Sequence, residues 1–334
     1  MTARSVVLTT HLCLGAAAAL FLFILGLTGA ILAFENDIDH WLYPSLYYVQ
    51  AGPRTIPEAD LVAAVERRFA PDRVKFVHIF REKNLVQMMQ LARGGTVFVD
   101  PYNAGVLGSR TKQPWTEDWL GYIHQLHTHL VPNPRSAPRA GHAGAIAVQI
   151  AGFMLCLLAP TGLILWWRMK RGSVKWRASW FRICFDLHNT VSLTHSSRPS
   201  RFPDLHSTEA KGAQPIPIDR AEAIARAALT ASTVSDLLLP QTPRDVFVLA
   251  LRRPEETSES VHSYAFVDQY SGRLLHLTDF YTDSFGYRVI RFNRSIHTGD
   301  IFGTAGHLIM ALSSFLLAVM AATGVVIWLK KLAV

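Results

Sequence analysis

The chain has 334 residues, half of them hydrophobic, with a formal net charge of +8 and three cysteines. This hydrophobic share exceeds that of an ordinary soluble domain, and much of it stands in three long apolar segments. The cysteines (Cys13, Cys156 and Cys184) form no Cys-x-x-Cys pair, and none stands in a hydrophilic region. This argues against a disulfide framework and against a thiolate metal cluster.

Residues 11–34, 144–167 and 303–329 are predicted to cross a membrane. Each segment reaches the roughly 20 apolar residues that a bilayer requires, and none contains Asp, Glu, Lys or Arg. The first segment is much longer than the apolar part of a signal peptide, which has about 7–15 residues. We therefore expect it to remain as a membrane anchor.

Basic residues flank these segments and set their expected orientation. Residues 168–182 carry six Lys or Arg and no acidic residue, Arg4 precedes the first span, and two lysines follow the last. By the positive-inside rule, residues 1–10, 168–182 and 330–334 are predicted to be cytoplasmic. Because the membrane accounts for much of the positive charge, no nucleic-acid partner is expected.

One crossing of the membrane is hard to find. Both chain ends are expected on the cytoplasmic side, so the path needs a fourth span between about Arg182 and His297. The best candidate, residues 183–203, becomes polar, basic and proline-broken after Leu193. Either the region after it is cytoplasmic and the C-terminus faces outward, or a span has been lost or replaced at residues 183–203. We favour the second interpretation.

The two hydrophilic regions, residues 35–143 and 204–296, resemble each other. Each opens with a helix candidate, at residues 56–69 and 216–229, that has a proline suited to a first helical turn. Strand-like patches follow at residues 75–80, 85–91 and 96–99 in the first region and 245–251, 263–267 and 274–277 in the second.

Similar turns follow the strand candidate at residues 96–99 in the first region and the one at residues 263–267 in the second. They are Asp100-Pro-Tyr-Asn-Ala-Gly105 and Asp268-Gln-Tyr-Ser-Gly272, both rich in turn-forming residues. The pattern predicts an internal repeat of a module made of a helix and an antiparallel sheet. A scaffold that holds helix ends and a substrate-docking role are about equally compatible with it.

Histidine stands near the start of each apolar segment and a Thr-Gly pair near its end: Thr28-Gly29, Thr161-Gly162 and Thr323-Gly324. Imidazole at the edge of a span is costly unless it is paired or useful, and binding a metal is a common use of neutral imidazole. Small residues also let transmembrane helices approach, and threonine can bond the preceding turn of its own helix. Both interpretations of the Thr-Gly pairs stay open.

Together these pieces resemble the PepSY-associated membrane family, specifically its ferric-siderophore-reductase-like branch. The resemblance covers nearly the whole chain. In chain order its motifs are His11-Leu-Cys-Leu-Gly15, Leu27-Thr28-Gly29, Leu126-His127, Thr161-Gly-Leu-Ile-Leu-Trp-Trp167, Asp186-Leu-His-Asn-Thr-Val191, Ile296-His-Thr-Gly-Asp-Ile-Phe-Gly303 and Thr323-Gly324 with Trp328.

The resemblance implies a four-helix protein of the bacterial inner membrane with two periplasmic PepSY-like modules. It also implies bis-histidine haem and a role in reducing periplasmic ferric siderophores. The chain departs from the family after Val191, where the family continues into a third helix. We therefore expect a membrane α-helical protein with α+β extramembrane modules and only three clear transmembrane helices.

The resemblance and the predicted depths assign haem b, in one or two copies, to His11, His127, His188 and His297. His127 and His297 are expected to pair near the periplasmic face, and His11 and His188 near the cytoplasmic face. Two alternative ligands are His124, on the same helix face as His127, and His307. His142 and His307 are expected first of all in helix packing or beside a pore. Six others are predicted to be surface or loop residues: His40, His78, His195, His206, His262 and His276.

The electron donor has to come from outside the chain. No Gly-x-Gly-x-x-Gly fingerprint stands in a strand–turn–helix context, so no flavin or nucleotide site is predicted. We expect a quinol, a reduced flavin or another reductase as donor, with the lipid bilayer and a ferric siderophore as further partners. Two hypotheses compete with this one: a cofactor-free regulatory or scaffolding membrane protein, and a truncated paralogue with one haem.

Overall fold

The computed structural model describes residues 3–110, 119–131, 138–169, 204–208, 213–256, 258, 262–283 and 285–332. The chain forms two compact units. The first, here called the membrane unit, comprises residues 1–35, 119–199 and 290–334, and the second, the sheet unit, comprises residues 36–118 and 200–289. The replaced span proposed at residues 183–203 lies outside the described residues, as do His188 and His195.

The membrane unit is helical and is built around α1 (Ala3–Leu32). This helix contacts α5 (Trp119–His129), α6 (Pro138–Met169) and α10 (Gly303–Leu332). Within the described part of the chain, three helical stretches are long and apolar enough to cross a membrane: Ser5–Leu32, Pro138–Gly162 and Asp300–Val326. The three predicted spans are therefore confirmed, and the protein is a membrane protein.

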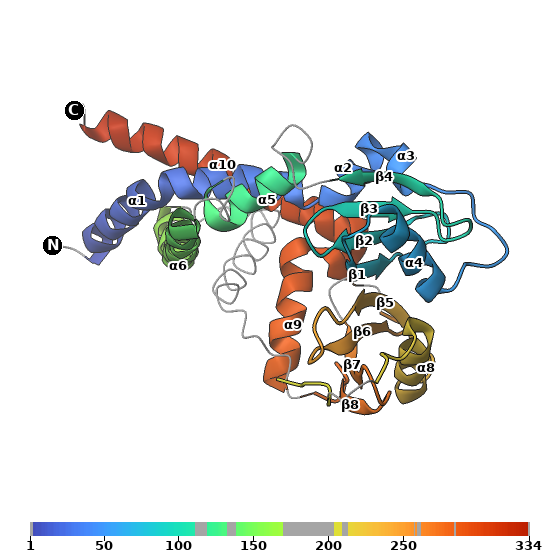
Figure 1. Cartoon of the computed structure of the whole chain (residues 1–334). Helices are drawn as coiled ribbons and strands as arrows, with labels where there is room; N and C mark the ends of the chain where they lie inside the picture. The colour runs from blue at the N-terminus through green and yellow to red at the C-terminus, as the bar shows by residue number, and fades with distance from the viewer. Residues whose placement is uncertain are drawn as a thin grey trace. The chain divides into compact units, whose positions relative to one another are not determined.

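Neighbouring helices of the membrane unit run in opposite directions. His11, early in α1, meets Thr161 and Gly162 late in α6, whereas Gly26, late in α1, approaches Ser314 in the first half of α10. Figure 1 shows α1 and α10 side by side, with the N- and C-termini at the same end. A small apolar core between the three helices fixes this arrangement: Ala18, Leu22, Ala151, Leu155, Leu158 and Leu317.

The sheet unit contains one antiparallel sheet in the order β4-β3-β2-β1-β5-β6-β7-β8. Its first four strands are β1 (Val74–Ile79), β2 (Gln87–Leu91), β3 (Thr96–Val99) and β4 (Val106–Arg110). The other four are β5 (Thr233–Leu238), β6 (Val246–Arg252), β7 (Ser263–Asp268) and β8 (Leu274–Thr278). Each set of four is one module of the predicted repeat, and the pairing of β1 with β5 joins the two modules.

One helix of each module covers the same face of this sheet, as Figure 1 shows. They are α4 (Glu58–Arg68) and α8 (Ile218–Ala228), which confirms both predicted helices. Pro57 and Pro217 occupy the cap position just before each helix, one residue earlier than predicted. Leu61 and Val65 from α4 share one core with Ala221 and Ala225 from α8. The two modules therefore share a single hydrophobic core.

The opposite face of the sheet carries α2 (Glu35–Leu42) and α3 (Pro44–Tyr47) on its first module. Asp39 and Arg110 form a two-bond ion pair there, with Nη1–Oδ2 and Nη2–Oδ1 distances of 2.7 and 2.9 Å. Burial lowers the pKa of His40, whose ring packs on that of Tyr47 at 4.2 Å between centres.

Two histidines on this face correct the prediction of surface or loop residues. His78 lies within β1 and its Nδ1 is 2.7 Å from Oδ1 of Asp236 on β5, and His262 is only 7% exposed. Burial by itself would raise the pKa of Asp236, but the bond to His78 and the charges of the nearby imidazoles lower it below its usual value. His78 inside one predicted strand and His262 just before another look like surface residues, because the pairing that brings β5 and its Asp236 beside β1 cannot be seen locally.

Candidate functional site

Two of the candidate histidines face each other in the membrane unit. His127 comes from the last turn of α5, and His297 from the last turn of α9 (Phe285–Thr298). Their ring centres are 6.3 Å apart and their planes are inclined by 43°. This arrangement brings together residues that are 170 positions apart, and we call it the outer histidine pair.

The outer histidine pair has the spacing that two imidazoles need to hold one metal ion between them. With metal–nitrogen bonds of about 2 Å, and about 1 Å from each nitrogen to its ring centre, two ligands on opposite sides of a metal have centres about 6 Å apart. Their planes can rotate about the common axis, so the observed inclination is compatible. The residues therefore fit a bis-imidazole haem iron.

The Thr28-Gly29 pair of α1 holds the ring of His127. Oγ1 of Thr28 lies 2.8 Å from Nδ1 of His127. A Cβ atom added at Gly29 would lie 3.1 Å from Cε1 of the same ring and 3.2 Å from Oγ of Ser314 on α10. The absence of a side chain at position 29 thus lets the ring lie against the backbone of α1.

A glycine turn positions His297. Gly299 follows α9 and has φ +89°, a left-handed conformation that glycine adopts without strain. A Cβ atom there would come within 2.6 Å of the carbonyl carbon of Gly306 in α10. The turn therefore folds the end of α9 tightly onto the beginning of α10.

The other histidines near this pair have identifiable partners. Nδ1 of His124 lies 3.2 Å from Oε2 of Glu35, and Nδ1 of His129 lies 2.7 Å from Oγ1 of Thr128. Nε2 of His307 lies 3.1 Å from Oδ1 of Asp300, and its ring meets Phe34 edge-on. His142 is exposed. Of the histidines along α5, His127 is the one that faces His297.

A second histidine is held in the same manner at the other end of α1. Nδ1 of His11 lies 2.9 Å from Oγ1 of Thr161, and a Cβ atom at Gly162 would lie 3.2 Å from Cε1 of His11. At about 1.5 Å of rise per residue, His11 and Thr28 stand about 25 Å apart along α1. Its expected partner His188 lies outside the described residues.

Sequence reasoning placed the Thr-Gly pairs at the membrane edges but missed that two of them, Thr28-Gly29 and Thr161-Gly162, hold a histidine of another helix. The signal was the repeated order of the residues, with histidine near the start of each span and Thr-Gly near its end. The third pair differs. Oγ1 of Thr323 bonds the carbonyl of Val319 at 2.8 Å, and within the described residues nothing stands within 4 Å of a Cβ atom at Gly324.

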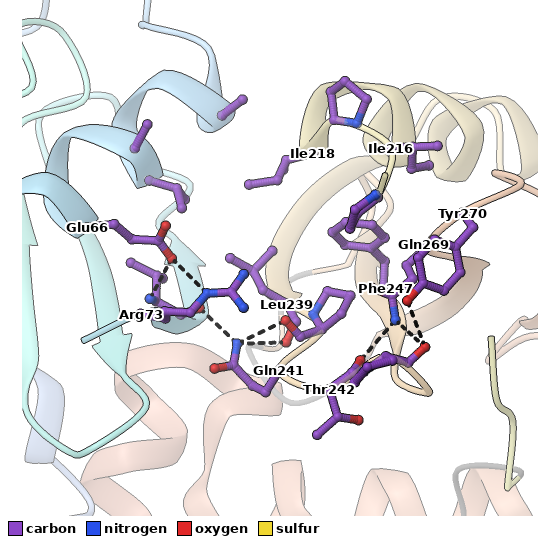
Figure 2. Close-up of a pocket in the computed structure, with 18 residues that line it drawn as sticks. Glu66, Arg73, Ile216, Ile218, Leu239, Gln241, Thr242, Phe247, Gln269 and Tyr270 are labelled. Atoms are coloured by element: carbon purple, nitrogen blue, oxygen red, sulfur yellow. Dashed lines mark hydrogen bonds and ion pairs between the residues drawn. The ribbon is translucent and has the colours of Figure 1, made fainter. Parts of the chain in front are cut away.

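The sheet unit has a cavity of about 440 Å³ between its two modules, shown in Figure 2. Its polar side chains are engaged in holding the surrounding loops. Nε2 of Gln241 bonds the carbonyls of Val74 and Leu239, and Nε2 of Gln269 bonds that of Asp245. Nε of Arg73 stands 3.9 Å from Oε1 of Glu66. No metal-binding group of three or more His, Cys, Asp or Glu occurs among the described residues, here or elsewhere.

Two buried carboxyl groups lie where α4 meets α8. Burial raises the pKa of Glu58 to about 7, and burial also raises the pKa of Glu222. Glu58 accepts a bond of 2.7 Å from Nε2 of Gln87. Among the described residues, Oε2 of Glu58 and Oε1 of Glu222 have no hydrogen-bond partner. Because burial raises the pKa of both groups, they make the stability of the sheet unit depend on pH.

Comparison with known proteins identifies the family. The model of the PepSY-associated TM region matches residues 8–196 and 277–331. The chain belongs to this family. The match includes all four candidate ligands, His11, His127, His188 and His297, whereas most of the second module lies outside it. No curated protein matches the chain.

Proposed function

We propose that this member of the PepSY-associated family is a haem b protein of the bacterial inner membrane that reduces a ferric siderophore on the periplasmic side. The single observation that carries the proposal is the outer histidine pair, with 6.3 Å between the ring centres of His127 and His297. The resemblance of the sequence to the ferric-siderophore-reductase-like branch of the family suggests the substrate class.

Four histidines of the chain would hold the proposed haem groups. His127 and His297 would hold the outer haem, and His11, with His188, would hold an inner one. When bound, a bis-imidazole haem supplies one-electron exchange between Fe(III) and Fe(II), at a potential set by its ligands and burial. The glycine at position 29 keeps His127 close to α1, and the turn at Gly299 fixes His297.

Placement of the histidines at opposite ends of α1 supports transfer across the bilayer. His11 and Thr28 stand about 25 Å apart along the helix, close to the roughly 30 Å thickness of the hydrocarbon core. The basic residues of the 168–182 loop favour the cytoplasm for the His11 end. Electrons would therefore enter near His11, from a quinol, reduced flavin or reductase, and leave near His127 and His297.

The absorption spectrum of the purified protein tests haem binding. We expect a Soret band that shifts when dithionite is added, and we expect His127→Ala and His297→Ala each to remove most of the outer haem. His124→Ala and His142→Ala are the matched controls, because these imidazoles do not face His297. A protein without a Soret band after expression with ample haem supply would overturn the proposal and favour the cofactor-free scaffold.

Haem stoichiometry separates a two-haem protein from a truncated one-haem paralogue. Two haems per chain, reduced to one by His188→Ala or by His11→Ala, would support both sites. A ratio of one that His188→Ala leaves unchanged would restrict the proposal to the outer site. A reporter fused within residues 204–296 would test the periplasmic placement of the sheet unit.

A further inference from the structure

Two threonines of the membrane unit each face the Nδ1 atom of a histidine from another helix. Oγ1 of Thr28 lies 2.8 Å from Nδ1 of His127, and Oγ1 of Thr161 lies 2.9 Å from Nδ1 of His11. The two contacts stand at opposite ends of α1 and use different pairs of helices. The same threonine–histidine contact therefore occurs at two independent places in the membrane unit.

The hydrogen of each threonine hydroxyl is already engaged. Oγ1 of Thr28 stands 2.7 Å from the carbonyl oxygen of Ile24, and Oγ1 of Thr161 stands 2.8 Å from that of Leu157. Two oxygens at this distance need a hydrogen between them, and a carbonyl has none to give. The threonine therefore donates its only hydrogen to its own helix.

It follows that the hydroxyl oxygen has to accept on the histidine side. The hydrogen between Thr28 and His127 then belongs to Nδ1 of the imidazole, and the same holds for Thr161 and His11. A neutral imidazole carries one N–H, so its Nε2 is unprotonated in this tautomer.

The glycine that follows each threonine completes the arrangement. Cβ atoms at Gly29 and Gly162 would lie 3.1 and 3.2 Å from Cε1 of His127 and His11. The glycine thus admits the ring edge while the threonine bonds Nδ1. Unprotonated Nε2 is the nitrogen that neutral histidine uses to bind a metal, and a bond to its other ring N–H is what fixes such ligands in place.

We propose that Thr28 and Thr161 are positioning residues, each of which locks its histidine in the Nδ1–H tautomer and so presents Nε2 as a metal ligand. This inference rests on the proposed haem function for its purpose, but its geometry stands on the protein alone. Loss of one hydroxyl bond of this kind changes the ratio of tautomers by about tenfold.

Nitrogen NMR of ¹⁵N-histidine-labelled protein without haem tests the proposal at a pH where the imidazoles are neutral. We expect His127 and His11 to carry their proton on Nδ1 in the unaltered chain. Thr28→Val, which keeps the branched shape, should convert His127 to a mixed population and leave His11 unchanged. Thr161→Val should have the reverse effect, and Thr28→Ser should restore His127.

Thr323→Val is the matched control, because Thr323 makes the same bond to its own helix and, within the described residues, meets no imidazole. An Nε2–H tautomer in the unaltered chain, or a His127 spectrum that Thr28→Val does not change, would overturn the inference. A protein that shows the expected tautomers but no Soret band would keep the inference and overturn the proposed function. A protein that binds haem but carries the proton of these histidines on Nε2 would keep the proposed function and overturn the inference.

Discussion

Gly26 of α1 lies against Ser314 of α10 so closely that a Cβ atom at position 26 would be 2.6 Å from the Ser314 carbonyl oxygen. Small residues that admit such contacts are a usual basis of helix association in membranes. One turn further along α1, Gly29 meets Ser314 and the ring of His127. Ser314 of α10 and His127 of the outer histidine pair therefore both lie against glycines near the end of α1.

Gly26→Ala should weaken the packing of α1 on α10. Its methyl group would overlap backbone atoms that cannot move aside independently, at a cost of about 1–3 kcal/mol. We expect a lower midpoint of thermal unfolding in detergent and a smaller yield of folded protein. Gly324→Ala is the control, because a Cβ atom there meets nothing within 4 Å among the described residues. Equal effects of the two changes would contradict the role of Gly26.

Glu58 should make the stability of the sheet unit depend on pH. Burial raises its pKa to about 7 from 4.5, so the folded state binds more protons than the unfolded state between these values. The free energy of unfolding therefore falls by at most about 3 kcal/mol as pH rises from about 4.5 to 7. Above pH 7 the contribution of Glu58 is constant. Glu58→Gln keeps the group neutral and should remove this slope.

Thermal midpoints of the full chain, measured from pH 5 to pH 8, check the prediction for Glu58. The variant should be more stable than the unaltered protein at pH 8, with little difference at pH 5. Asp60→Asn, which changes an exposed carboxylate of the same helix, provides the control. A variant that is less stable at every pH would show that the charge of Glu58 is required for folding.

Arg110→Lys should destabilise the sheet unit although the charge is kept. The guanidinium makes two bonds to Asp39 and stacks over the Tyr43 ring at 4.4 Å, and lysine can reproduce neither arrangement. Because both ionic groups are mostly shielded from water, we expect a loss of about 1–3 kcal/mol.

Arg73→Lys is the matched change for Arg110→Lys in the same unit. Its guanidinium is 63% exposed and stands 3.9 Å from Glu66, so its replacement should cost less than about 1 kcal/mol. Thermal midpoints of both variants, measured at one pH, decide the comparison. A shift for Arg73→Lys as large as that for Arg110→Lys would mean that exposure does not govern these ion pairs.

The sequence was sufficient to predict the spans, helices α4 and α8, and six strands. Apolar length and proline position are local signals, and so is β-branched content in strands such as β1 and β6. Strands β4 and β5 were missed. Gly108 interrupts β4, and Asp236 lies at an irregularity of β5, so neither shows a clean alternation. β4 is stabilised by its pairing with β3, and β5 by its pairing with β6 and with the distant β1.

For the site, sequence reasoning selected His127 and His297 from their motifs but could not choose among the histidines of α5 on physical grounds. His124 and His127 share one helix face. The choice depends on Glu35, which meets His124, and on Thr28, which meets His127. Glu35 is the first residue of α2 and Thr28 lies in α1, 89 and 99 residues before their histidines, so only packing reveals these partners.

Leu237→Ala should destabilise both modules of the sheet unit together. Leu237 is 1% exposed, lies on the joining strand β5 opposite Val77 of β1, and belongs to the core shared by α4 and α8. Removing its side chain should cost about 2–5 kcal/mol. Because the core is continuous, the loss should spread across the pairing of β1 with β5.

Hydrogen exchange measured by mass spectrometry should show faster exchange in β2 as well as in β6. Val248→Ala is the comparison, since Val248 packs with Phe266 in a separate cluster of the second module and should affect that module more. Faster exchange confined to β5–β8 in the Leu237→Ala protein would mean that the modules unfold independently despite their common sheet.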